Sequence, residues 1–210
     1  MDDAPPASAP LTEGASVRRA PSGRRRLALF CLAMAPVAAL LGLLAWGAVQ
    51  SSGNPGGLAV NAAPGEEPAS GRRAPDFAVT TLDGGRVYDN EALRGKYALI
   101  DFWSSWCPPC RAEASDLAAV YEEYKDAPVE FVGVAIWDET RAVLSHVERY
   151  RVGYPNAMDT DGDMVVAFGV RGIPEKYVLD REGRIVRKLT GPVSRERLRQ
   201  ILDELLADDG

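Results

Sequence analysis

The sequence predicts an α/β domain built on a mixed, helix-covered sheet and preceded by one membrane-spanning helix. Three observations carry this prediction. Two runs of strand length, Tyr97–Trp103 and Val129–Ile136, are apolar on both faces, as central strands of a covered sheet are. Apolar residues recur at helical spacing between and after these runs. Upstream, Leu27–Val49 holds 23 residues without a charge.

Two hairpins are expected around the central strands. Asp83-Gly84-Gly85 and Arg181-Glu182-Gly183 are turn sequences, and each lies between two short strand-like segments. The segments that these turns join are 77–82, 86–88, 176–180 and 184–189.

Three helices are predicted from the apolar residues that repeat at helical spacing. Asp138 is expected to cap the second helix and Ser194 the third. The apolar positions are Leu117, Val120, Tyr121 and Tyr124; Val143, Val147 and Tyr150; and Leu198, Ile201, Leu202 and Leu205.

The composition excludes several classes of protein. With 46% hydrophobic and 26% charged residues in a chain of 210, wholesale disorder is excluded. Three cysteines and one histidine exclude a disulfide-stapled scaffold and a multi-histidine metal centre. Residues 74–210 carry 25 acidic and 17 basic residues, a net charge of −8, which argues against a nucleic-acid partner.

The N-terminal third is expected to anchor the protein. Residues 1–26 are rich in Ala, Pro, Ser and Arg and predict a disordered basic tail. As a helix, residues 27–49 would span about 34 Å, enough for a hydrocarbon core of about 30 Å. Five arginines precede this span and no basic residue follows it until Arg72, so the N-terminus is expected in the cytoplasm. Residues 50–73 predict a flexible tether, and residues 74–210 form the extracytoplasmic domain.

A cleaved signal peptide is the main alternative to this anchor. Its apolar region is usually about 7–15 residues long, which is shorter than this span. No small-x-small cleavage site follows Val49 closely, and Arg24-Arg25-Arg26-Leu27 is only a weak twin-arginine signal. Cys31 lies inside the span and is interpreted as a small apolar residue.

The strongest chemical signal is Cys107-Pro108-Pro109-Cys110, which follows the first central strand and opens a helix. This arrangement puts Cys107 at a helix N-terminus, exposed, where the helix dipole and free amides stabilise a thiolate. Cys110 is close enough to form a disulfide and release a mixed-disulfide partner. A structural disulfide or half a zinc site are the alternatives, and the zinc site lacks two further ligands.

Two further features bear on the redox chemistry. Pro108 and Pro109 have no N–H groups, so the Cys107 thiolate loses two potential donors, which favours a reductant over a strong oxidant. Asp101 lies in the middle of a buried strand, where burial raises a carboxyl pKa toward neutrality and suits proton exchange with Cys110. The alternative is an Asp that reaches water.

The stretch ALIDFWSSWCPPC resembles the active-site sequence of thioredoxin. Residues 74–207 are similar to membrane-anchored, extracytoplasmic thioredoxin-like proteins of the TlpA/ResA/CcmG (DsbE) type. The resemblance implies a thioredoxin fold with an N-terminal hairpin and a strand-helix insertion. It rests on C-x-x-C-x-x-E, here Cys107 to Glu113, and on Gly172-Ile173-Pro174-Glu175, which matches the family's G-x-P-E.

The resemblance also implies roles for individual residues. Ile173, Pro174 and Glu175 are expected at the substrate-docking edge, with Pro174 cis and close to the disulfide. Trp106, Pro108 and Pro109 are expected to contact a substrate beside Cys107. Glu113 matches the family's active-site acid, and a solvated first-turn glutamate is its alternative. Two positions depart from the pattern: Asp101 is often Asn in these relatives, and Lys176-Tyr177 replaces Thr-Phe, placing a charge near the docking surface.

The expected activity is a protein-disulfide reductase in which Cys107 attacks, Cys110 resolves, and Asp101 and Glu113 manage protons. The resemblance implies a membrane dithiol donor of the CcdA/DsbD kind and oxidised apocytochrome c as a substrate. No cofactor or metal is expected. A thiol peroxidase is one alternative, although Ile100 stands where its P-x-x-x-[ST]-x-x-C motif has proline; Ser104 fits. A copper or heme chaperone is another.

Weaker motifs are interpreted as structural. The acidic run 159–163 is only loosely similar to a calcium loop, because its glycine is misplaced and Val170 stands at the twelfth position. His146 adjoins an apolar helical face and is expected to be structural or exposed.

Overall fold

A computed structural model describes residues 23–50, 59–67 and 70–207. The chain divides into two units, 1–53 and 54–210, which are described separately. In the first unit, α1 (Gly23–Gln50) is a single helix that continues through Pro36. Within it, Leu27–Trp46 has a mean hydropathy of 2.5 and exposed side chains, and it is long and apolar enough to cross a membrane. Most of the predicted basic tail, residues 1–22, lies outside the described residues.

The second unit is built on a six-stranded sheet in the order β2-β10-β9-β5-β6-β7. β5, β6 and β7 run parallel, whereas β9 and β10 are antiparallel to their neighbours, so the sheet is mixed, as predicted. In chain order its strands are β2 (Gly65–Glu67), β5 (Tyr97–Trp103), β6 (Val129–Ile136), β7 (Asn156–Asp159), β9 (Glu175–Leu179) and β10 (Ile185–Thr190).

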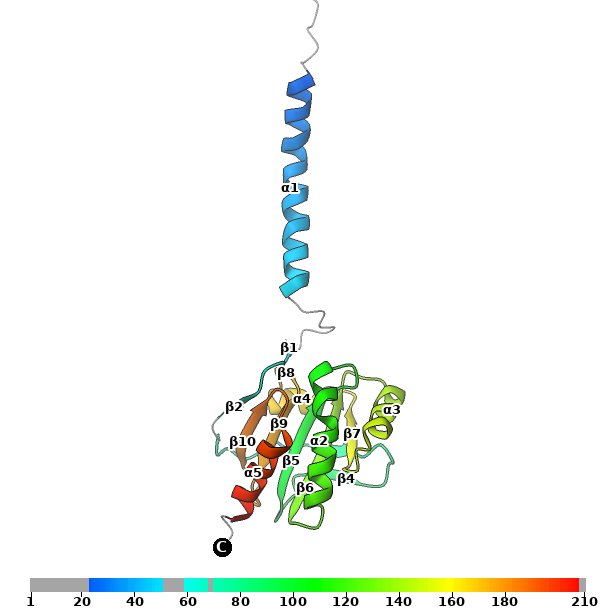
Figure 1. Cartoon of the computed structure of the whole chain (residues 1–210), viewed down its shortest axis with the longest axis vertical. Coiled ribbons are helices and arrows are strands. Elements are labelled where there is room, and N and C mark those ends of the chain that lie inside the picture. The colour runs from blue at the N-terminus through cyan, green and yellow to red at the C-terminus, as the bar shows by residue number, and fades with distance from the viewer. Residues whose placement is uncertain (1–22, 51–58, 68–69, 208–210) are drawn as a thin grey trace, which may run out of the picture. The chain divides into compact units, whose positions relative to one another are not determined.

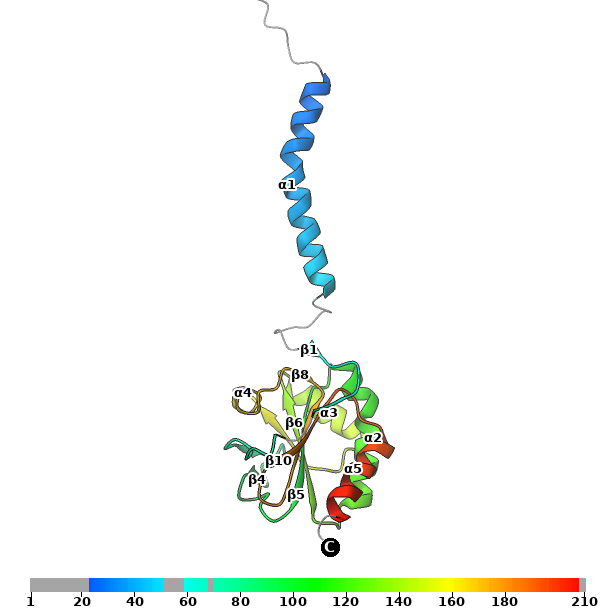
Figure 2. The same ribbon diagram turned by 90° about the vertical axis from the view of Figure 1, so that its left-hand side faces the viewer.

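Helices cover both faces of this sheet. α2 (Pro108–Tyr124) and α5 (Arg195–Ala207) pack on one face (Figure 2). α4 (Asp163–Phe168) and the hairpin β3–β4 (Ala78–Thr80, Val87–Asp89) pack on the other. α3 (Thr140–Tyr150) lies near the edge strand β7 (Figure 1).

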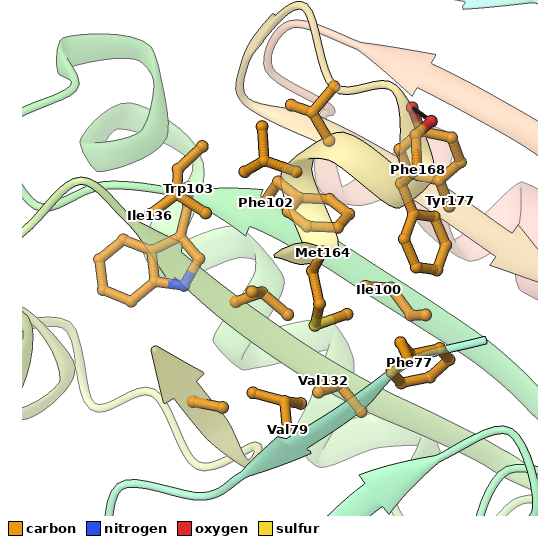
Figure 3. Packing of buried hydrophobic residues seen from close by; sticks show 14 of the residues in the cluster. Phe77, Val79, Ile100, Phe102, Trp103, Val132, Ile136, Met164, Phe168 and Tyr177 are labelled. Carbon is orange, nitrogen blue, oxygen red and sulfur yellow. Dashed lines mark hydrogen bonds between the residues drawn. The ribbon is translucent and has the colours of Figure 1, made fainter. Parts of the chain in front are cut away.

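Side-chain alternation along β5 divides the core in two. Ile100 and Phe102 pack in the cluster under α4 and the hairpin, where Phe102 meets Phe168 and Tyr177 in tilted and edge-on ring contacts (Figure 3). Leu99 points to the opposite face and packs against the apolar residues of α2 and α5. From Tyr97 to Phe102, the odd and even positions of the strand therefore serve different layers, whereas Trp103 at its end packs with Ile100 and Phe102.

The element predictions mostly hold. The two long central strands have the predicted bounds, both hairpins form, and Ser194 Oγ accepts the Arg197 amide as a helix cap. The predicted cap Asp138 is wrong: α3 begins after Glu139, and Asp138 instead accepts hydrogen bonds from the amide and hydroxyl of Ser105.

The expected tether over 50–73 has to be revised in part. Residues 65–67 form β2, which pairs with β10, and β1 (Ala59–Val60) pairs with β8 (Gly172–Ile173). Of the rest of the tether, residues 51–58 and 68–69 lie outside the described residues. The folded part therefore begins near residue 59 rather than at 74, because backbone pairing recruits a segment whose composition is that of a linker.

Candidate active site

The sequence at the end of β5 builds a redox disulfide at the start of α2. Cys107 and Cys110 are joined by a disulfide with their Cα atoms 5.3 Å apart. Cys107 is the N-cap of the helix, and its sulfur accepts the Cys110 amide at 3.3 Å. The expectation that Cys107 is exposed is wrong, because its exposed fraction is 0%.

The two prolines between the cysteines limit the donors to Cys107. Pro108 and Pro109 are the first residues of α2 and have no N–H groups. In the described residues, the Cys107 sulfur accepts a hydrogen bond from the backbone amide of Cys110. A thiolate formed at Cys107 therefore gains less hydrogen-bond stabilisation than one at a helix start with free first-turn amides.

Beneath the start of the helix, a buried lysine joins two buried carboxyl groups. Lys176 on β9 stands directly across from Asp101 on β5, with its Nζ 3.5 Å from Asp101 Oδ1. The same Nζ donates to Glu113 Oε1 at 2.6 Å and to the Gly191 carbonyl at 3.4 Å. Glu113 Oε2 accepts the Val193 amide at 2.7 Å.

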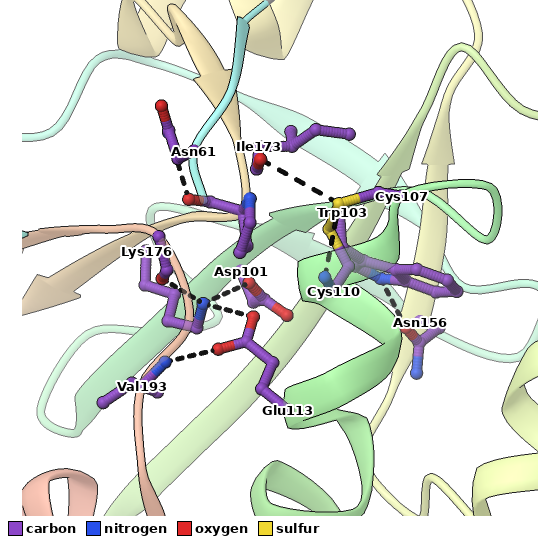
Figure 4. A network of polar contacts seen from close by, with 12 residues as sticks. Asn61, Asp101, Trp103, Cys107, Cys110, Glu113, Asn156, Ile173, Lys176 and Val193 are labelled. Atoms are coloured by element: carbon purple, nitrogen blue, oxygen red, sulfur yellow. Dashed lines mark hydrogen bonds and ion pairs between the residues drawn. A yellow bond between two sulfur atoms is a disulfide. The ribbon is translucent and has the colours of Figure 1, made fainter. Parts of the chain in front are cut away.

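This cluster of Asp101, Glu113 and Lys176 lies on the α2 side of the sheet, and Figure 4 shows both carboxyl groups turned toward Nζ. Glu113 follows Cys110 by three residues, so the two side chains lie on neighbouring parts of one helix face. In the view of Figure 4, Asp101 lies between Nζ and the disulfide. Within the described part of the chain, Asp101 Oδ1 accepts no hydrogen bond, and its contact with Lys176 Nζ is an ion pair at 3.5 Å.

Burial sets the protonation of the cluster. It raises the pKa of Asp101 against the attraction of Lys176. It also raises the pKa of Glu113 to about 7, with Lys176 opposing the shift and Asp101 adding to it. For Lys176, burial lowers the pKa, but Glu113 and Asp101 together raise it more, so the ammonium stays charged. One ammonium with two ionised carboxylates is net negative, so near neutral pH the two acids share a proton.

Sequence reasoning missed the position of Lys176. It was expected near the docking surface, but its exposed fraction is 0% and it points into the domain. The available signal was strand alternation, because Lys176 and Val178 share one face of β9 and face the α2 layer. Glu113 is also buried, so its alternative as a solvated glutamate is wrong.

The six residues expected to dock a substrate fall into two sets. Trp106 and Pro109 are half-buried and Pro108 is exposed, beside the disulfide. The Ile173–Pro174 peptide is cis, and the Ile173 carbonyl oxygen lies 3.9 Å from the Cys107 sulfur.

Glu175 is a correction to the expected docking set. It is 2% exposed, accepts from the Arg171 amide and the Tyr177 hydroxyl, and pairs with Lys188 at 3.4 Å. A substrate cannot reach this carboxylate, which acts inside the fold.

The weaker motifs have structural contacts. His146 stacks between Trp103 and Tyr150, and burial lowers its pKa to about 4. Asp159 accepts the amides of Met164 and Val165 at the start of α4. Among the described residues, no group of three or more His, Cys, Asp or Glu side chains is arranged to hold a metal ion.

Comparison with known proteins agrees with this geometry. Residues 70–188 match the AhpC/TSA family. Thiol-disulfide oxidoreductase ResA of Bacillus anthracis is 30% identical over 135 residues, which cover 64% of this chain and 78% of that protein.

Two solved structures are also similar. A secreted Mycobacterium tuberculosis disulfide oxidoreductase homologous to E. coli DsbE is 31% identical, with a TM-score of 0.56 over 61% of this chain and 96% of that one. A thiol:disulfide interchange protein of Chlorobium tepidum is 29% identical, with a TM-score of 0.60 over 67% and 99%.

A redox disulfide at a helix N-terminus, on a thioredoxin fold, defines a thiol-disulfide oxidoreductase. The chain belongs to the AhpC/TSA family and, within it, to the thioredoxin-like oxidoreductases of the TlpA/ResA/CcmG type.

Replacing Lys176 with methionine tests the charge balance of the cluster. Without the ammonium, the pKa values of Asp101 and Glu113 rise further above their unfolded values. Stability then falls as pH rises through the folded pKa values. We expect Lys176→Met to lower the free energy of unfolding by about 3 kcal/mol at pH 8, and by less at pH 5, where the acids are protonated.

Urea denaturation at both pH values measures this effect. Lys125→Met, which removes an exposed ammonium paired with Glu122, is the control and should change little at either pH. An equal loss of stability at pH 5 and pH 8 for Lys176→Met would show that the ammonium does not balance the two acids.

Proposed function

We propose that the protein is a membrane-anchored reductase of protein disulfides that acts outside the cytoplasm. The observation that carries the proposal is the Cys107–Cys110 disulfide at the start of α2, with two prolines between the sulfurs and a buried proton-holding cluster beneath them. The relatives named ResA support a thiol-disulfide exchange role.

The reaction begins from the reduced dithiol. Cys107 loses its proton and attacks one sulfur of a substrate disulfide, which forms a mixed disulfide and releases the other substrate sulfur as a thiolate. Cys110 then loses its proton and attacks Cys107, which re-forms the protein disulfide and releases the second substrate thiolate. Two electrons pass to the substrate, and its two thiolates take up the two protons.

Asp101 and Glu113 are proposed to handle the proton of Cys110. This thiol is 3% exposed, so water reaches it poorly, and a nearby acid with a raised pKa can accept its proton near neutral pH. Asp101 is the better acceptor because Lys176 Nζ holds its Oδ1 only through an ion pair at 3.5 Å, whereas both Glu113 oxygens accept hydrogen bonds, at 2.6 and 2.7 Å. One negative charge remains on the two acids, and the Lys176 ammonium pairs with it.

The N-terminal helix supports the proposed location. Leu27–Trp46 is apolar and exposed along its length, and arginines precede it in the sequence, three of them within α1. A basic flank favours the cytoplasmic side, so we propose that the redox domain lies on the other side of the membrane. Electrons must then cross the membrane, and we propose a membrane dithiol protein of the CcdA/DsbD kind as the donor.

A thiol peroxidase is the competing function within the same family. Ser104 stands at the [ST] position of the peroxidase's P-x-x-x-[ST]-x-x-C motif. Here the Ser104 hydroxyl donates to the Ile136 carbonyl at 2.6 Å and the residue is buried, so it is occupied by the fold. The second redox sulfur, Cys110, also favours disulfide exchange.

The reduction potential tests the proposed direction. Because Pro108 and Pro109 withhold amide donors from the Cys107 thiolate, the reduced form is weakly stabilised and the dithiol should be reducing. Equilibration with glutathione should give a value nearer that of thioredoxin, about −270 mV, than that of DsbA, about −120 mV. A value near that of DsbA would make the protein an oxidant.

Trapping with Cys110→Ser tests location and substrate together. Without the resolving sulfur, the partner stays disulfide-linked to Cys107. We propose apocytochrome c as the substrate, so the trapped partner should carry C-x-x-C-H heme-attachment motifs and remain with full-length protein in the membrane fraction. Cys107→Ser is the control and should trap nothing. A soluble, shortened protein would contradict the anchor, and a partner without this motif would contradict the substrate.

A further inference from the structure

The edge beside the disulfide is already occupied by a segment of the same chain. β1 (Ala59–Val60) runs parallel to β8 (Gly172–Ile173), immediately before Pro174. The Asn61 amide donates to the Ile173 carbonyl at 2.8 Å, and Asn61 Nδ2 donates to the Pro174 carbonyl at 3.3 Å. We call residues 59–61 the strap; Figure 4 shows Asn61 on this edge, near Ile173.

The strap occupies a backbone edge that lies beside the attacking sulfur. The Ile173 carbonyl that it engages lies 3.9 Å from the Cys107 sulfur. Val60 packs against the apolar cluster that includes Cys107 and Ile173, and Cys107 itself is 0% exposed. While the strap is in place, an incoming chain cannot pair with the Ile173 carbonyl, which lies beside the Cys107 sulfur.

The strap is also held by few contacts. β1 pairs over only two residues, and the three residues that follow the strap, Ala62 to Pro64, are exposed; the chain is next held at β2, which pairs with β10. Segments with few buried contacts open locally at a small fraction of the global free energy of unfolding. Such a segment can leave the edge without unfolding the sheet.

We propose that the strap is an internal competitor for the substrate-docking edge, released when a substrate with an extended disulfide-bearing segment pairs with β8 in its place. The proposal rests on the proposed function, in which Cys107 attacks a protein disulfide. Strand addition requires a free extended backbone. Disulfides in unfolded polypeptides are therefore better substrates than disulfides inside regular secondary structure. The apparent affinity for substrate equals the affinity of the released form multiplied by the fraction of molecules in which the strap is released.

Proline at position 61 tests the proposal in the full-length protein in detergent. Asn61→Pro removes the amide donor to Ile173 and the side-chain donor to Pro174. Ala62→Pro, at an exposed position outside the β1–β8 pairing, is the matched control. In a Cys31→Ser, Cys110→Ser background Cys107 is the only thiol, and its alkylation by iodoacetamide reports access to the sulfur.

We expect Asn61→Pro to speed alkylation by about five- to tenfold at every pH without moving the pH midpoint, and Ala62→Pro to change it less than about twofold. When both active-site cysteines are present, Asn61→Pro should speed thiol-disulfide exchange with a disulfide-bonded unfolded peptide, and by the same factor in the forward and reverse directions. Asn61→Ala, which removes only the side-chain bond, should give an intermediate effect and serves if the proline variant fails to fold.

Equal alkylation rates for the variants at positions 61 and 62 would overturn the proposal, as would unchanged peptide exchange. A failure of the reductase assignment would show instead in the equilibrium constant of the exchange. That constant is independent of the strap, so the two failures are distinguishable.

Discussion

The ammonium group of Lys176 is the interaction on which the arrangement of the redox site depends. A buried charge is tolerated only when partners surround it, and here they come from three separate parts of the fold. β5 supplies Asp101, α2 supplies Glu113, and the turn after β10 supplies the Gly191 carbonyl. Glu113 in turn accepts the Val193 amide, so the same cluster connects the redox helix to the start of α5.

This constraint links packing to chemistry. Because Glu113 follows Cys110 by three residues, holding its carboxylate against Lys176 also fixes the rotation of α2 and hence the positions of both sulfurs. The cluster has two carboxyl groups and only one ammonium. Near neutral pH the two acids therefore share one proton, so that only one of them is ionised. A site that stabilises the fold with a single ammonium therefore also keeps an exchangeable proton beside the resolving cysteine, which is buried and poorly reached by water.

The sequence predicted the parts of the structure that depend on local patterns. Tyr97–Trp103 was identified as a central strand because its apolar residues occupy both faces, and Cys107-Pro-Pro-Cys110 identified the helix start. Asp101 was expected to be buried because of that strand, and it is.

Features that depend on contacts between distant segments were missed. Lys176 was expected at the surface because a lone lysine gives no local sign of burial; only its register opposite Asp101 reveals its partner. Cys107 was expected to be exposed, as its place at a helix start suggests. In the structure Cys107 is buried, and a segment more than 40 residues upstream pairs with the neighbouring strand β8. The composition of that segment is that of a linker and gave no sign of a strand.

The most direct measurement is the rate at which Asp101→Asn resolves a mixed disulfide, followed by stopped flow across pH, with thiolate absorbance at Cys107 recorded separately. If Asp101 accepts the Cys110 proton, the variant should resolve about tenfold or more slowly at pH 7. The deficit should shrink as pH approaches the thiol's own pKa, and Cys107 should titrate as before. Asp116→Asn, at a half-buried position on the same helix that pairs with Arg195 away from the cluster, should match the unmodified protein. Resolution by Asp101→Asn at the unmodified rate at every pH would contradict the account and leave Asp101 with a structural role alone.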